Sequence, residues 1–270
     1  NLISLIQPDE IYNLAAQSHV AVSFKNPVYT SQTGLGTLNI LEAVKNSKKN
    51  IKYYQASSSE MFGGANEEML DEESVFDPKS PYAASKVFAH NMTKIYRESY
   101  GLFCVNGILF NHESPLRGET FVTRKISRAV GRISNEIQKS LTLGNLSASR
   151  DWGFAGDYVE GMWKMLQTPK PGTYILATGR NETIRNFAKL AFKAADINIE
   201  FLGHNEKEYG IDKKTGKVIL RVNKEFYRPA EVDVLLGDPT LAKNQLNWHP
   251  KTSLEDLASM MVLSDLKRQK

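Results

Sequence analysis

Short apolar runs alternate with helical patterns through the first half of the chain. The runs at 10–16, 52–58 and 103–110 are rich in apolar and aromatic residues, which is typical of buried strands. Between them, residues 33–47 and Pro81 to about Tyr100 have the pattern of helices. Strands that alternate with helices form a parallel sheet covered on both faces. The pattern therefore predicts an α/β fold built on a parallel sheet.

Beyond His112 the pattern is less regular. We expect helices at about 120–138, 157–166, 181–195 and within 237–250, strands at 141–144 and 173–179, and a hairpin turn at 213–218. These elements predict two domains: 1–112 with a return segment at about 149–180, and a smaller α/β domain formed mainly by 113–270. Ligands of parallel sheets bind at the carboxyl ends of the strands. NLAAQS, ASSSEMFG and FNHESP each follow a strand, so a ligand site is expected there.

Composition argues against several classes of protein. A net charge of +4, from 34 basic and 30 acidic residues, is too small to indicate nucleic-acid binding. No apolar run approaches the roughly 18 residues of a membrane span, and no signal-peptide pattern is visible. The single Cys104 excludes an internal disulfide and lies in an apolar run, which favours a buried structural thiol. These features favour a cytoplasmic location.

Basic residues cluster in one segment. Five of them fall within sixteen residues: Arg117, Arg124, Lys125, Arg128 and Arg132. They form either a solvated helix face, the usual place for Lys and Arg, or a pocket for a phosphorylated small molecule.

The segment SPYAASK predicts the start of a helix that carries two reactive side chains. Ser80 is a suitable N-cap and Pro81 suits the first helical position. Tyr82 and Lys86 are four residues apart, so they share a helix face and the ammonium can favour the phenolate. An ordinary helix start without chemistry is the alternative.

Two further polar residues are expected near this pair. A phenol has a pKa of about 10 and needs help to act as a base at neutral pH, which Lys86 can supply. Ser58 ends the predicted strand and can bond a substrate oxygen, and Glu60 offers a carboxylate for a second proton transfer. Otherwise Ser58 is only a polar strand end and Glu60 a surface acid. The candidate catalytic residues are Ser58, Glu60, Tyr82 and Lys86.

Seven segments occur in one order: YNLAAQSHV, QASSSEMFG, SPYAASK, GILFNHESP, VTRKISRAV, GNLSASRDWG and YRPAEVDVLLGDP. Together they resemble the GDP-mannose 4,6-dehydratase family of extended short-chain dehydrogenases/reductases. Y-x-x-x-K alone marks the whole superfamily, whereas FNHESP, RDWG and RP-x-EVD together are specific to the dehydratases. The similarity runs from about Ile3 to the C-terminus. It implies a Rossmann-like doubly wound sheet that binds NADP and a C-terminal nucleotide-sugar-binding domain.

The resemblance also implies a lyase reaction that is redox-neutral. Tyr82 would remove the proton of the sugar 4-hydroxyl while hydride passes from carbon 4 to NADP, and Lys86 would bond the nicotinamide ribose. Glu60 would then remove the carbon 5 proton, water would leave from carbon 6, and hydride would return there. GDP-mannose would become GDP-4-keto-6-deoxy-mannose, a precursor in GDP-fucose biosynthesis.

Further site residues are implied by matching positions, and no metal is implied. Cofactor contacts would be Leu14, Ala15, Ala16, Gln17, Ser18, Tyr29, Lys86, His112 and Arg117. For His112, bracing a turn is the alternative. Substrate contacts would be Asn111, Val122, Lys125, Gly144, Asn145, Arg150, Arg228 and Glu231.

The chain departs from the family pattern in three places. No Gly-rich phosphate-binding turn follows a strand near Asn1, so we expect roughly seventy to eighty upstream residues, with the first strands, to be missing. The 270-residue polypeptide alone would then bind NADP poorly and be inactive. Ser58 stands where the family usually has Thr. Leu116 replaces an Arg in a loop that reaches a neighbouring subunit in relatives, although a homo-oligomer, dimer or tetramer, is still expected.

Three alternatives remain at this point. A 4-epimerase or dTDP-glucose dehydratase of the same superfamily is the nearest, although epimerases lack the carboxylate of Glu60 and dTDP-sugar dehydratases carry Asp-Glu where this chain has Ser59-Glu60. An inactive truncated nucleotide-sugar-binding fragment is the second. Nucleic-acid binding through the basic cluster is the third.

Overall fold

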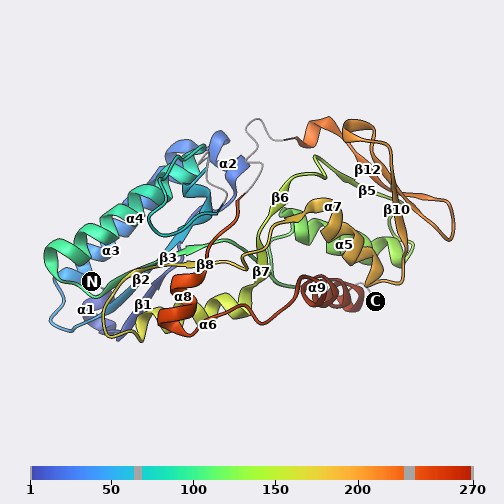
Figure 1. Cartoon of the computed structure of the whole chain (residues 1–270). Coiled ribbons are helices and arrows are strands. Elements are labelled where there is room, and N and C mark those ends of the chain that lie inside the picture. The colour runs from blue at the N-terminus through green and yellow to red at the C-terminus, as the bar shows by residue number, and fades with distance from the viewer. Residues whose placement is uncertain (1, 64–68, 228–234, 269–270) are drawn as a thin grey trace. The chain divides into compact units, whose positions relative to one another are not determined.

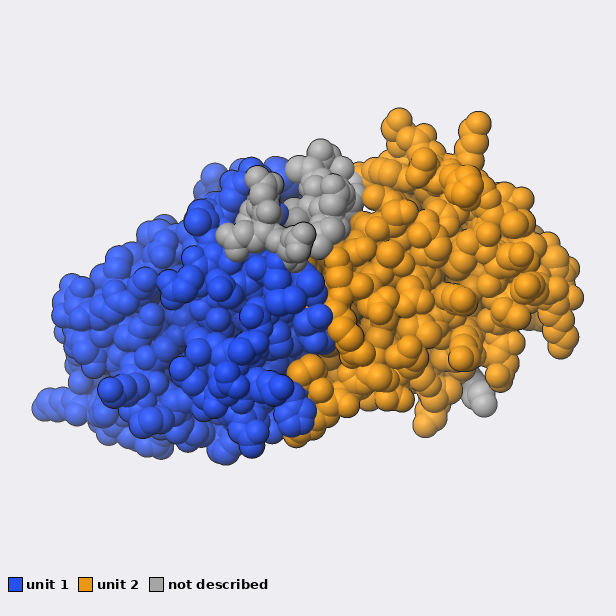
Figure 2. Space-filling model, viewed as in Figure 1, with its two compact units in different colours: residues 1–110, 158–179, 236–249 blue, residues 111–157, 180–235, 250–270 orange. Residues whose placement is uncertain are grey.

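A computed structural model of the chain describes residues 2–63, 69–227 and 235–268. The chain forms two compact units, shown in blue and orange in Figure 2. Unit 1 comprises Asn1–Phe110, Tyr158–Gly179 and Leu236–His249, and unit 2 comprises Asn111–Asp157, Arg180–Leu235 and Pro250–Lys270. Each unit therefore consists of three separate stretches of sequence.

A four-stranded sheet forms the centre of unit 1 (Figure 1). Its strands, in spatial order, are β1 (Glu10–Asn13), β2 (Lys52–Ser58), β3 (Cys104–Leu109) and β8 (Thr173–Leu176). All three strand pairs are parallel. The predicted α/β fold with a parallel sheet is confirmed.

Helices cover both faces of this sheet, as predicted. The helices of unit 1 are α1 (Leu2–Ile6), α2 (Val20–Lys25), α3 (Pro27–Lys45), α4 (Pro81–Tyr100), most of α6 (Ala155–Leu166) and α8 (Thr240–Leu246). Neighbouring residues of β2 point to opposite faces: Tyr53 packs with Leu41 and Tyr96 of α3 and α4, whereas Tyr54 packs in a cluster with Tyr158 and residues of α8. Cys104 is fully buried in the first cluster, and burial raises the pKa of its thiol to about 12. It is therefore an inert structural thiol.

One row of the sheet is polar rather than apolar. Residues in register across the four strands are Asn13, Gln55, Asn106 and Thr173. Asn13 Nδ2 donates to Gln55 Oε1 (2.9 Å). The row also bonds to the helices on its face: Asn13 to Thr37 of α3, Asn106 to the His90 carbonyl of α4, and Thr173 to Arg97 of α4. Hydrogen bonds thus pair most polar atoms of this row in an otherwise apolar interior, although Asn106 Oδ1 is buried without a partner in the described part of the chain.

Most predicted boundaries are close to those of the structure. β2 and α4 match the prediction, while β3 is one residue shorter at each end. Helix α3 begins six residues before the predicted 33, because Pro27 is suited to a first helical turn. β1 ends at Asn13 instead of 16, and the apolar Leu14 that follows is more than half exposed.

Unit 2 contains a second four-stranded sheet and three main helices. The strand order is β10 (Ile199–Leu202), β11 (Tyr209–Asp212), β12 (Val218–Val222) and β5 (Leu141–Leu143). Two short pairs, β4 (Asn111–Glu113) with β7 (Trp152–Phe154) and β6 (Ser149–Arg150) with β9 (Glu182–Thr183), lie outside this sheet. β11 and β12 form a hairpin, which confirms the predicted turn at 213–218.

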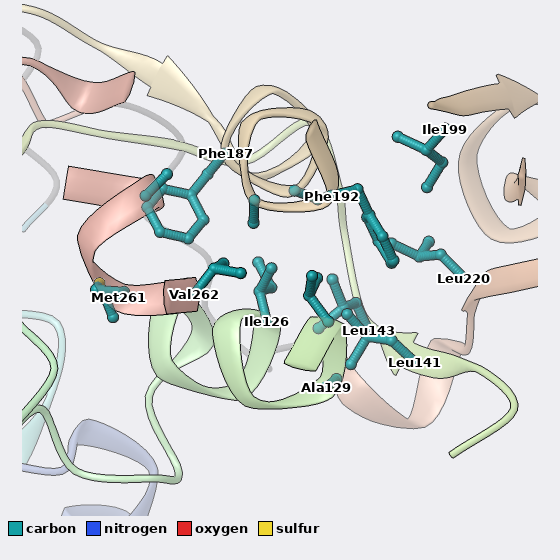
Figure 3. Packing of buried hydrophobic residues seen from close by; sticks show 14 of the residues in the cluster. Ile126, Ala129, Leu141, Leu143, Phe187, Phe192, Ile199, Leu220, Met261 and Val262 are labelled. Atoms are coloured by element: carbon teal, nitrogen blue, oxygen red, sulfur yellow. The ribbon is translucent and has the colours of Figure 1, made fainter. Parts of the chain in front are cut away.

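The helices of unit 2 enclose an apolar core (Figure 3). They are α5 (Val122–Ser134), α7 (Ile184–Lys193) and α9 (Leu254–Arg268). α5 is shorter than the predicted 120–138, and α9 is absent from the predicted elements. A buried ion pair between Arg124 and Asp265 joins α5 to α9, and Ser127 Oγ also donates to Asp265 (2.8 Å). Arg124 is therefore neither solvated nor a phosphate ligand, which corrects both interpretations of the basic cluster at this residue.

The length and apolar character of the helices test whether one of them could span a membrane. In residues 2–63, 69–227 and 235–268, no helix combines the length and the apolar character that crossing a bilayer requires.

Candidate active site

Helix α4 begins at the carboxyl end of the sheet, at the N-cap serine and the proline that predict a helix start. Ser80 Oγ accepts a hydrogen bond from Ala83 N (3.1 Å), and Pro81 occupies the first helical position. This N-cap satisfies one of the helix amides that lack an intrahelical partner. The start of the helix then places Tyr82 and Lys86, both buried, one turn apart.

Close packing of α3 against α4 holds the part of α4 that carries Tyr82 and Lys86. Gly34 of α3 faces Ser85, and a Cβ on Gly34 would lie only 3.0 Å from Ser85 Oγ. Ser85 Oγ also donates to the Thr30 carbonyl (3.2 Å). Ser85 lies between Tyr82 and Lys86 in sequence, so this contact holds the stretch of helix that carries both.

Lys86 has an unusual environment for an ammonium group. Its Nζ donates to the Ala56 carbonyl of β2 (2.8 Å) and lies 5.8 Å from the centroid of the Tyr82 ring. Burial lowers the pKa of Lys86 from 10.5 to about 8. Among the described residues Ala56 is its only hydrogen-bond acceptor, although an ammonium has three donors. This arrangement suits a ligand that brings hydroxyl oxygens.

Ser58 and Glu60 lie where β2 ends and the 3₁₀ turn η1 (Ser59–Met61) begins. Ser58 Oγ accepts from Glu60 N (3.3 Å), so the hydroxyl caps the turn that carries the carboxylate. Ser58 is buried and Glu60 is half-buried. Because α4 contacts both β2 and η1, the structure brings these two residues to the element that carries Tyr82 and Lys86.

The candidate cofactor residues of unit 1 follow β1. Leu14, Ala15 and Ser18 are exposed, and Ala16 and Gln17 are half-buried. The Gln17 amide is tied down, since its Nε2 donates to the His19 carbonyl (3.1 Å) and its Oε1 accepts from Thr30 Oγ1 (3.4 Å). The candidate Tyr29 lies on α3 and is 62% exposed. The stretch after β1 is thus an accessible loop at the carboxyl end of the sheet.

In unit 2, the candidates Asn111 and His112 lie on β4, paired in register with Trp152 and Gly153 of β7. Asn111 Nδ2 is buried and has no hydrogen-bond partner in the described part of the chain. A buried donor without a partner is costly unless a ligand supplies an acceptor.

Arg117 contacts two residues near it in sequence. Its Nε lies 3.2 Å from Glu113 Oε2, and its guanidinium lies 3.7 Å over the Phe121 ring. Thr123 Oγ1 donates to the same Glu113 oxygen (2.6 Å). Burial raises the pKa of Glu113, and the Arg117 charge opposes that rise. Glu113 therefore ties the loop that carries Arg117 to the start of α5, next to the candidate Val122.

Three residues from separate elements of unit 2 meet at the end of β5. A Cβ on Gly144 would lie 2.5 Å from the Phe226 carbonyl oxygen, so only glycine fits there. Lys125 Nζ lies 4.2 Å from the centroid of the Phe226 ring, and burial lowers the pKa of Lys125. Asn145 follows Gly144, and its Oδ1 accepts from Ser147 N (2.9 Å). Phe226 is not among the residues predicted from sequence, although its position just before the Y-R-P motif is a signal that could have found it.

The remaining substrate candidates differ in environment. Arg150 is buried on β6, and its guanidinium donates to the Ser149 carbonyl (2.7 Å). Arg228 and Glu231 lie outside the described residues.

Comparison with known proteins identifies the family. A family model described as GDP-mannose 4,6 dehydratase matches residues 1–261. The chain belongs to this family. A protein of Sinorhizobium fredii named GDP-mannose 4,6-dehydratase is 51% identical over 272 residues, which cover 98% of this chain and 78% of that protein. GDP-mannose 4,6 dehydratase 2 of Arabidopsis thaliana is 52% identical over 273 residues, covering 99% of this chain and 68% of that protein.

The fold agrees with this membership in the GDP-mannose 4,6-dehydratase family. The structure of RMD from Pseudomonas aeruginosa complexed with NADPH superposes with a TM-score of 0.82 at 22% identity, covering 97% of this chain and 82% of that chain. The expected Rossmann-like α/β fold is thereby confirmed.

Proposed function

We propose that the chain converts GDP-mannose to GDP-4-keto-6-deoxy-mannose and water, with NADP as its bound cofactor. The family match across residues 1–261 supports this function. The observation that carries it is the arrangement at the carboxyl end of β2, where Glu60 and Ser58 adjoin the helix with Tyr82 and the buried Lys86. This arrangement offers both a base for a hydroxyl group and a carboxylate for a carbon acid.

The residues of unit 1 suit a nicotinamide cofactor. Lys86 has donors directed to no described protein acceptor, so it can bond the hydroxyls of a ribose. The loop from Leu14 to Ser18 and Tyr29 on α3 would supply further contacts, and His112 and Arg117 are further candidates for the cofactor by their positions in the family pattern. When bound, NADP accepts a hydride from carbon 4 of the sugar and returns it to carbon 6.

The side chains then move the protons. Tyr82, favoured as phenolate by the Lys86 charge, takes the proton of the 4-hydroxyl, and Ser58 Oγ bonds the same oxygen. The 4-ketone that forms acidifies the proton on carbon 5, which the Glu60 carboxylate removes. One of these two protons leaves with the carbon 6 hydroxyl as water, and the other returns to carbon 5 after hydride reaches carbon 6. The proton count balances, and no net oxidation occurs.

Residues of unit 2 would hold the nucleotide sugar. Lys125 and Arg150 provide positive charge for a diphosphate, and Arg228 and Glu231 would bond phosphate and ribose oxygens. Asn111, Val122, Gly144 and Asn145 complete the proposed set. The unpartnered Nδ2 of Asn111 is the member whose own environment most favours a ligand acceptor.

A 4-epimerase is the competing activity, and the carboxylate of Glu60 is what disfavours it. An epimerase has no use for a base at carbon 5, whereas a dehydratase requires one.

We also propose that the protein is cytoplasmic and assembles as a homo-oligomer, dimer or tetramer. Size-exclusion chromatography with light scattering tests the assembly.

Isotope transfer tests the reaction directly. The protein, expressed from its complete reading frame, would be incubated with NADP and GDP-mannose deuterated at carbon 4. The expected product is a 4-keto-6-deoxy sugar nucleotide with deuterium at carbon 6. A deuterated 4-epimer, or loss of the label to solvent, would contradict the proposal.

Two variants locate the chemistry. Tyr82→Phe should lower kcat by about a thousandfold, since it removes the first base. Glu60→Gln should stop the reaction after the first hydride transfer, so that absorbance of reduced nicotinamide at about 340 nm persists and no 6-deoxy product forms. The exposed Glu73→Gln is the matched control and should retain full activity. Normal product formation by Glu60→Gln would exclude Glu60 as the second base.

A further inference from the structure

His90 lies one helical turn beyond Lys86 and continues the face of α4 that carries the catalytic candidates. Tyr82, Lys86 and His90 follow each other at four-residue intervals, and all three are buried. The first two have roles in the proposed reaction. His90 has none so far, although a buried imidazole is costly unless its polar atoms are paired.

The ring of His90 is held by a specific contact to β2. Its Nδ1 lies 2.9 Å from Ser57 Oγ, and both residues are buried. The Phe76 ring meets the imidazole edge-on, with centroids 5.0 Å apart at 77°. Burial, aided by the charges of Arg97 and Lys94, lowers the pKa of His90 to about 4. At neutral pH the imidazole is therefore uncharged, and its bond to Ser57 is a neutral one.

Ser57 is placed between two residues that matter for the site. Ala56 precedes it, and its carbonyl accepts from Lys86 Nζ (2.8 Å). Ser58, the hydroxyl proposed to bond the sugar oxygen, follows it. Lys86 and His90 thus link α4 to consecutive residues of β2. Together these two links, one helical turn apart, fix the end of β2 against this part of α4.

The two links are not equivalent. In the proposed reaction the Lys86 ammonium bonds the cofactor as well as the Ala56 carbonyl, so the position of the ammonium must suit both partners. Within the described chain, the only hydrogen bond of the His90 side chain is the one with Ser57. It can therefore hold α4 to β2 whether or not the cofactor site is filled.

We propose that His90 is a positioning residue: its hydrogen bond to Ser57 fixes the end of β2 against α4 and thereby sets Ser58 relative to Tyr82. The inference rests on the proposed function, in which these two hydroxyls act on one sugar oxygen. Displacement by about 1 Å at such a site lowers rates up to about a hundredfold. A hydrogen bond that only stabilised the fold would instead lower the melting temperature and leave the turnover of folded protein unchanged.

Substitutions on both sides of the bond test this. His90→Phe keeps an aromatic ring against Phe76, and Ser57→Ala removes the hydroxyl. Each should lower kcat about tenfold, with the KM for GDP-mannose changed less than about twofold, because the loss falls on the transition state. The double variant should be no slower than either single one, since both remove the same interaction. His90→Asn, whose amide can replace Nδ1, should recover kcat to within about threefold of wild type.

Thr93→Val is the matched control. Thr93 is fully buried on α4, but its hydroxyl donates to the Ala89 carbonyl within the same helix (2.8 Å). It should destabilise the protein without lowering kcat. Urea unfolding of the cofactor-free variants gives a readout independent of activity: Ser57→Ala and His90→Phe should show a coupling that neither shows with Thr93→Val.

The outcomes separate the two proposals. Wild-type kcat in folded Ser57→Ala and His90→Phe, or an equal loss in Thr93→Val, would overturn the positioning role. If His90→Phe does not fold, Ser57→Ala decides alone. A wild-type protein that turns over no GDP-mannose would overturn the proposed function and this inference with it.

Discussion

Replacing Lys86 by methionine should make the folded protein more stable while it abolishes activity. Burial lowers the pKa of Lys86 from 10.5 to about 8, and each tenfold change in proton affinity corresponds to about 1.36 kcal/mol, so keeping the buried group charged costs about 3 kcal/mol. Loss of the bond to the Ala56 carbonyl offsets about 1 kcal/mol. That carbonyl is not left unpaired, because Gln55 Nε2 also donates to it (3.1 Å). The net expected gain at pH 7 is about 2 kcal/mol.

The stability difference between wild type and Lys86→Met should depend on pH. The folded pKa of about 8 lies below the unfolded value of 10.5, so the unfolded wild type binds more protons between these two pH values. The wild type should therefore gain stability relative to Lys86→Met as pH rises through this window, and the difference should shrink. Urea unfolding of cofactor-free protein at pH 7 and at pH values up to about 10 measures it. A variant less stable than wild type at pH 7, or a difference that does not change with pH, would refute the reasoning.

Three further predictions concern other parts of the site. Ser58→Thr should keep kcat within about threefold, because the hydroxyl remains, whereas Ser58→Ala should lower it at least about tenfold in steady-state assays. Gly144→Ala should raise the KM for GDP-mannose about tenfold, because its Cβ would meet the Phe226 carbonyl at 2.5 Å, while Gly36→Ala, with no neighbour within 4 Å, should not. The pKa of His90 is about 4 in the fold and 6.5 when unfolded, so its contribution to stability should be constant above pH 6.5 and fall by about 3 kcal/mol toward pH 4; urea midpoints that do not move between pH 6.5 and pH 4 would contradict it.

The elements that could be predicted from sequence are those whose signals are local. Helix α4 matches its prediction because a serine N-cap, a proline at the first position and a glycine C-cap mark its ends. Gly101 has a φ of 64°, a conformation that favours glycine. β2 matches because an aromatic run ends in serines. The candidate residues on these two elements consequently lie together, as expected.

What could not be predicted depends on contacts between distant segments. The ion pair of Arg124 with Asp265 joins residues 141 positions apart, and nothing in the sequence of the basic cluster distinguishes Arg124 from the other four members. The contact of Phe226 with Lys125 and Gly144 likewise joins three elements that are separate in sequence. The link from His90 to Ser57 crosses from helix to strand. Periodicity identifies elements, but it does not say which polar atoms meet.

The polar row across the sheet of unit 1 has a consequence for folding specificity. Side chains of a strand alternate between faces, so a slip of one residue in pairing would move the row's members to the opposite, apolar face. Asn13, Gln55 and Asn106 would then be buried without the helix partners that they have now, at about 1–3 kcal/mol for each unsatisfied group. An all-apolar sheet would tolerate several alignments of its parallel strands. The row penalises such one-residue slips, and in the native alignment the carboxyl ends of β2, β3 and β8 come level at Ser58, Leu109 and Leu176.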